Sequence, residues 1–94
     1  MEHDDRMRVV VGAINGPTYE LSKLFSALET LPINIQIGVI ALVFRRDYKL
    51  GTLDDEKYAK WAVSVYDLVV NNKLDVPQCI EDAKHYVCQW VASG

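Results

Sequence analysis

Fourteen residues at the centre of this 94-residue chain, from Leu31 to Phe44, constrain its fold most strongly. Twelve of the fourteen are non-polar, the exceptions being Asn34 and Gln36. A segment that is apolar on every side must be surrounded by other parts of the protein. It is also shorter than the roughly 20 residues that a helix needs to cross a bilayer. We therefore expect this run to form the buried centre of a small globular domain.

The secondary structure of this run has two interpretations. Ile33, Ile35 and Ile37 alternate as in a β-strand, and isoleucine favours strands. However, no turn signal interrupts the chain before Gly51, and a closing Lys-Leu-Gly is typical of a helix C-terminus, where glycine can adopt a positive φ. Because an isolated pair of strands is only marginally stable, a buried helix of about 15 residues is the favoured interpretation.

Three flanking segments show helical periodicity, at residues 17–31, 53–72 and from Asp75 onwards. Pro17 suits the first turn of the first helix, and Thr52 with Asp55 resembles a capping box at the start of the second. The expected inward-facing residues are Leu21, Leu24, Phe25, Leu28 and Leu31 in the first helix, Tyr58, Trp61, Ala62, Val65, Leu68 and Val69 in the second, and Val76, Ile80, Ala83, Val87, Trp90 and Val91 in the third.

The pattern as a whole predicts a single all-α domain over residues 1–94, a small bundle of four or five helices around a buried central helix. Residues 1–5 are expected to be frayed. The segment at residues 6–14 fits either a short helix or a strand. The alternative fold is therefore α+β, with residues 7–14 and 35–44 as paired strands.

Composition and charge narrow the class of protein. The formal net charge is −3 and the pI about 5.2, whereas a nucleic-acid-binding domain is usually basic. The acidic N-terminus has no apolar stretch of the kind that a signal peptide requires, so we expect a cytoplasmic protein. In that compartment Cys79 and Cys88 stay reduced.

The usual patterns of enzymes and metal proteins are missing from the sequence. It contains no nucleophile elbow, zinc-protease helix or paired CxxC, and Gly12 and Gly16 match no phosphate-binding loop. Glu81, His85 and Cys88 lie along one side of the expected last helix, but no fourth metal ligand is evident. We therefore expect a non-enzymatic protein without a metal or cofactor.

The basic cluster, Arg45, Arg46 and Lys49, is the only net-positive group in the sequence. Cations in the last turn of a helix stabilise its dipole, which is the simpler interpretation. The alternative is a phosphate or nucleic-acid contact, which would make the chain a nucleic-acid or phosphate-ligand binding protein.

A second apolar stripe runs along the helix expected at residues 53–72. This second stripe consists of Ala59, Val63, Tyr66 and Val70. It lies about 130° round the helix from the expected inward-facing residues of the same helix, which form the first stripe. A peripheral helix needs only one buried stripe, so either the helix is sandwiched inside the domain or the second stripe contacts another chain. The sequence therefore predicts a protein-interaction module, an adaptor or inhibitor that forms a homodimer or larger homo-oligomer and occupies a partner's surface, with Tyr66 as an anchor.

Overall fold

The computed structural model describes residues 3–16, 18–52 and 55–93, and these residues form five α-helices and no β-strand. The helices are α1 (His3–Asn15), α2 (Leu21–Leu28), α3 (Ile33–Leu50), α4 (Asp55–Asn72) and α5 (Val76–Ser93). The predicted all-α fold is confirmed, and the alternative with strands at residues 7–14 and 35–44 is wrong. Helix α1 begins at His3, within the segment expected to be frayed.

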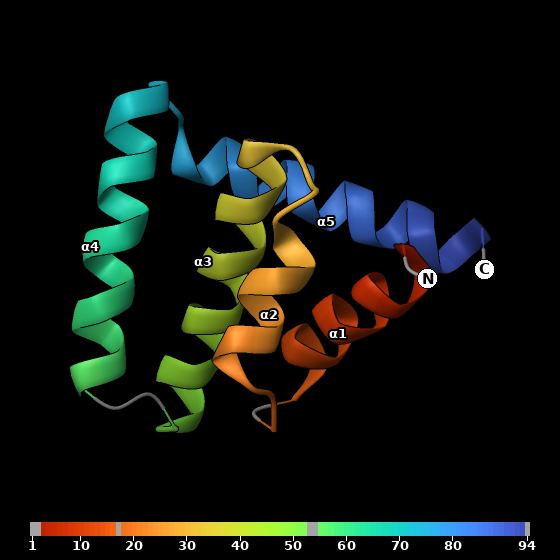
Figure 1. Ribbon diagram of the computed structural model, residues 1–94, viewed down its shortest axis with the longest axis horizontal. Helices are drawn as coiled ribbons and strands as arrows, with labels where there is room; N and C mark the ends of the chain where they lie inside the picture. Colours follow the sequence, from red (N-terminus) through yellow and green to blue (C-terminus); the bar gives the residue numbers. More distant parts are fainter. Residues whose placement is uncertain (1–2, 17, 53–54, 94) are drawn as a thin grey trace.

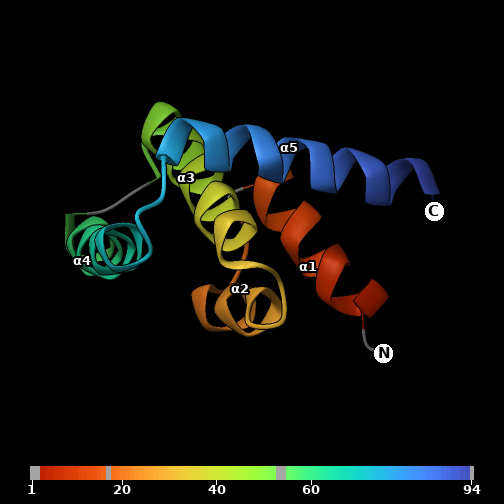
Figure 2. The same cartoon turned by 90° about the horizontal axis from the view of Figure 1, so that it is seen from above.

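Helix α3 is the buried central helix that the sequence predicts. Viewed from above, α5 crosses one side of α3, α2 lies on the opposite side, and α1 and α4 flank it (Figure 2). These neighbours account for the largely apolar sequence of its part up to Phe44. Its buried residues are Ile35, Ile37, Gly38, Val39, Ile40, Val43 and Asp47. In the described part of the chain, no helix is long and apolar enough to span a membrane.

The two polar residues of the central run each have a structural partner. The Asn34 side-chain amide donates a hydrogen bond to Asp82 of α5 at 3.0 Å, and that of Gln36 donates to the Leu31 carbonyl at 2.8 Å. At the other end of α3, Gly51 adopts a φ of 73°, which is the left-handed C-cap expected for that glycine.

Helices α3 and α5 are in close contact at Gly38. A Cβ added to this glycine would overlap the Cys79 carbonyl oxygen and lie 2.6 Å from the Ala83 Cβ, inside van der Waals contact. Small residues on both helices therefore allow the backbones to touch, and the Asn34–Asp82 hydrogen bond joins the same two helices.

Helix α2 is shorter than the helix predicted at 17–31. It begins at Leu21, and the preceding residue, Glu20, has extended backbone angles (φ −97°, ψ 128°). Pro17 lies outside the described residues, as do the two residues between Thr52 and Asp55, the members of the proposed capping box. Instead, the Thr52 hydroxyl lies 3.4 Å from the Asp47 carbonyl oxygen, its acceptor at the end of α3.

Candidate interaction surface

Helix α4 stands at one edge of the molecule, with the rest of the bundle on one side only (Figure 1). Of its described side chains only Trp61 is buried, while Val65, Leu68 and Val69 are half-buried. Ala62, predicted to face inwards, is exposed, since one step along the helix turns it about 100° away from Trp61. The Tyr58 side chain is outside the described set. Helix α4 is therefore attached along one narrow face.

Trp61 is the anchor of that attachment. Its side chain is 1% exposed, and its ring centroid lies 5.0 Å from that of Phe25 in α2 and 3.6 Å from that of Phe44 in α3. The indole Nε1 is buried and has no hydrogen-bond partner among the described residues. The contact of α4 with the bundle is consequently aromatic and apolar, with no polar interaction from the indole.

The second stripe faces away from the bundle. Val63 is 65% exposed, Tyr66 68% and Val70 53%, and Ala59 is exposed as well. These are three of the seven large hydrophobic side chains exposed in the described part of the chain, and the other four are divided among α2, α3 and α5. A single exposed hydrophobic residue is ordinary, whereas several on one face mark an interaction site. Helix α4 is thus not sandwiched inside the domain.

Charged side chains border the second stripe on one side. A helical rotation of about 100° per residue places Glu56, Lys60 and Asp67 together along this border. Lys60 Nζ lies 3.7 Å from Glu56 Oε1, and both side chains are largely exposed. An apolar strip with a charged rim is the usual anatomy of a protein–protein contact.

The basic cluster is not assembled as one surface. Arg45 and Lys49 are exposed, but Arg46 turns inwards. Its Nε donates to Asp47 Oδ1 at 2.7 Å, and its Nη1 donates to the carbonyl of Ile14, in the last turn of α1, at 2.8 Å. The structure therefore keeps two of the three predicted cations on the surface and uses the third internally.

Asp47 is the centre of a buried polar network that the sequence analysis did not identify. Asp47 is 4% exposed, and the Tyr19 hydroxyl donates to its Oδ2 at 2.6 Å. Burial raises the pKa of Tyr19, and the hydrogen bond to Asp47 and the charge of that carboxylate raise it further, while Arg46 opposes them. The sequence contains one signal for this network. Asp47 lies four residues after Val43, which places it on the buried side of α3.

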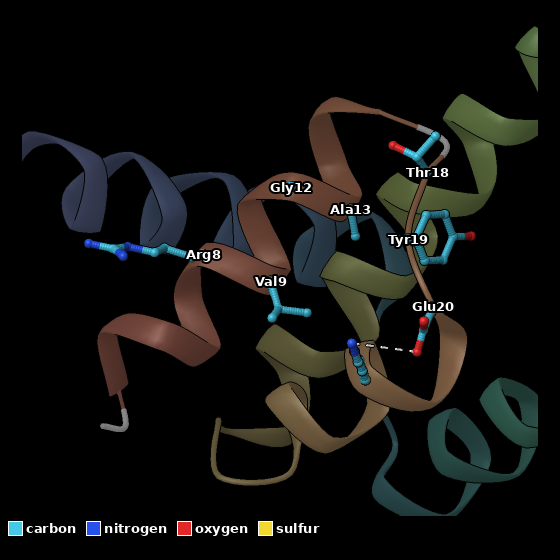
Figure 3. Close-up of a pocket in the computed structure, with 8 residues that line it drawn as sticks. Arg8, Val9, Gly12, Ala13, Thr18, Tyr19 and Glu20 are labelled. Atoms are coloured by element: carbon cyan, nitrogen blue, oxygen red, sulfur yellow. Dashed lines mark ion pairs between the residues drawn. The ribbon is translucent and has the colours of Figure 1, made fainter.

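An open hollow of about 540 Å³ lies between α1 and the segment that enters α2 (Figure 3). Its charged residues do not converge. Arg8 extends away from the other labelled residues, and Glu20 pairs with Lys23 at 3.7 Å. Gly12, on its α1 wall, belongs to a regular helix rather than a phosphate loop. The hollow therefore lacks the convergent polar groups of a ligand site.

Metal-ligating and nucleophilic residues do not gather in the described part of the chain. No group of three His, Cys, Asp or Glu side chains there could hold a metal ion. Cys79 is buried and Cys88 exposed, and both are free thiols. Burial raises the pKa of Cys79, and the charges of Asp82 and Asp75 add to the effect, so its reactive thiolate form is disfavoured.

No protein-family model, curated protein or solved structure matches this chain. Its function is therefore inferred from its own surface.

Proposed function

We propose that this protein is a small, non-enzymatic protein-interaction module, an adaptor or inhibitor, that self-associates and occupies a partner's surface through the second stripe of α4. The observation that carries the proposal is the exposure of Val63, Tyr66 and Val70 along one face of one helix. Covering this face would remove apolar area from water, which is the main driving force for protein association. Tyr66 supplies a large ring with a polar tip, a residue type enriched at such contacts.

The alternative function, binding of a phosphate ligand or nucleic acid through the basic cluster, has less support. Arg46 already donates to Asp47 and to the Ile14 carbonyl, which leaves Arg45 and Lys49 as the exposed cations of the cluster. A net charge of −3 also opposes association with a polyanion.

The proposal predicts a dimer or larger oligomer in solution. The second stripe is one helix long and smaller than a standard interface of about 1,200–2,000 Å², so we expect a reversible complex with a micromolar or weaker Kd. Sedimentation equilibrium over a range of protein concentrations measures this association. A wild-type protein that stays monomeric at the highest concentration would contradict self-association.

A double variant, Val63→Glu with Val70→Glu, tests whether the second stripe is the contact. Both positions are exposed, so circular dichroism should show a folded protein, and sedimentation should show a monomer because the contact would bury unpaired charges. The matched control, Val91→Glu with Gln89→Glu, adds the same charge at exposed positions of α5 and should associate like the wild type. Equal association of the two double variants, or unfolding of the first, would overturn the proposal.

A further inference from the structure

We infer that two copies of this protein pair through α4 in an antiparallel, two-fold symmetric arrangement. This inference rests on the self-association proposed above and adds its orientation and register. A two-fold contact uses the same surface of both copies, so the surface must be complementary to itself. The second stripe and the charges beside it meet this condition in one orientation.

The spacing of the second stripe reads the same from either end of α4. Ala59, Val63, Tyr66 and Val70 are separated by four, three and four positions. When one helix is reversed, Ala59 lies opposite the partner's Val70, and Val63 lies opposite the partner's Tyr66. Each pair joins a smaller side chain to a larger one, so the two helices can approach closely along the whole stripe.

The charges beside the second stripe also favour this orientation. In this register Lys60 lies near the partner's Asp67 on the charged border. In a parallel pair Asp55 and Glu56 would instead lie level with their own copies, which repel each other. Exposed ion pairs contribute little stability, but they select the orientation of paired helices.

The existing pair between Lys60 and Glu56 does not oppose this arrangement. It is an exposed i,i+4 pair at 3.7 Å, of a kind that contributes little stability. The position of α4 also permits the contact, because no other helix of the bundle lies beyond its outer face in either view (Figures 1 and 2). A second molecule can therefore approach along the full length of α4.

Disulfide trapping tests the orientation directly. The variants Ala59→Cys and Val70→Cys are made with Cys88→Ser, which removes the exposed native thiol, while buried Cys79 is kept. In the antiparallel pair, two copies of residue 59 are about 16 Å apart along the helix axis, beyond the roughly 7 Å between Cα atoms that a disulfide spans. We expect neither variant to cross-link with itself on oxidation, and the equal mixture to form a covalent dimer.

Several outcomes would overturn the inference. Self-cross-linking of each variant without mixed dimers would show a parallel pair, and the proposed self-association would still stand. Dimers in sedimentation without any cross-link would show a different register or face. If the same variants and the wild type are all monomers, self-association itself fails. The variant Val91→Cys, on the exposed side of α5, is the control for random collision and should not cross-link in any mixture.

Discussion

Helices α3, α4 and α5 each contain 18 residues, yet α4 is attached very differently from the other two. The backbones of α3 and α5 touch at Gly38, and the Asn34–Asp82 hydrogen bond lies in the same contact. Helix α4 contacts α3 and α2 mainly through Trp61 and leaves its other face in water. The comparison shows that apolar content does not by itself identify the core, because α4 has two apolar faces and the bundle covers one.

This difference also predicts a difference in local stability. Close backbone packing distributes many dispersion contacts between α3 and α5, whereas Trp61 is the one fully buried side chain among those described in α4. Regions with few buried contacts open with smaller free energies than the core. We therefore expect α4 to separate from the bundle before α3 separates from α5.

Replacement of Trp61 by Ala should have the largest effect. Loss of a fully buried Trp typically lowers stability by about 3–5 kcal/mol, and here the loss should fall on the attachment of α4. Hydrogen exchange followed by NMR should show α4 amides losing protection while α3 and α5 amides keep theirs. Equal loss of protection in all three helices would show that α4 belongs to the same cooperative unit.

Trp61→Phe is the matched control. It keeps an aromatic ring between Phe25 and Phe44 and removes an indole N–H that has no partner among the described residues. A buried donor without a partner lowers stability, so its removal offsets part of the lost ring area. We expect much smaller changes than for Trp61→Ala.

Gly38→Ala should disrupt the close contact between α3 and α5. The new methyl group would meet the Cys79 backbone, which cannot turn aside as a side chain can, so α3 and α5 must separate. Overpacking of this kind lowers the free energy of unfolding by about 3 kcal/mol, the upper end of its usual range, measurable by urea denaturation.

Gly12→Ala is the control, since open space surrounds that glycine in α1, and it should raise stability by about 0.5–1 kcal/mol. Equal effects of the two variants would contradict the close approach.

Tyr19→Phe should have the smallest effect at neutral pH. It removes a hydrogen bond to the buried Asp47 carboxylate, a loss of about 1.5 kcal/mol, at the low end for a charged acceptor because Tyr19 is only half-buried. The raised pKa of Tyr19 means that its contribution is complete below the unfolded value of about 10 and declines as the pH rises above it. The stability difference between wild type and variant should therefore shrink above that pH, as measured by urea denaturation. A constant difference would contradict the assigned role of the hydroxyl.

The helices could be predicted from the sequence because their signals are local. Hydrophobic periodicity marks α2, α4 and α5, and Gly51 ends α3 as expected, whereas the pattern at residues 6–14 fits a strand as well as the helix α1 that forms there. The network around Asp47 could not be predicted in the same way, because it joins Tyr19 to a residue 28 positions away. For the same reason the internal role of Arg46 was missed: its acceptor is a backbone carbonyl, which periodicity cannot reveal.

The second stripe could be predicted from the sequence only in part. Its four residues could be identified from their spacing, since the apolar arc of α4 is wider than one contact requires. Whether that arc faced the core or solvent depended on which side of α4 meets α3, and this is a tertiary property. The structure shows that the Trp61 side faces inwards and the Tyr66 side faces solvent.

Hydrogen exchange in α4 at two protein concentrations tests the central claim most directly, namely that the outer face of α4 binds a second copy. Binding stabilises the folded form by mass action, and the gain grows with protein concentration. We predict that α4 amides become better protected at high concentration and that Val63→Glu with Val70→Glu abolishes this gain. Protection of α4 that does not depend on concentration would contradict the claim.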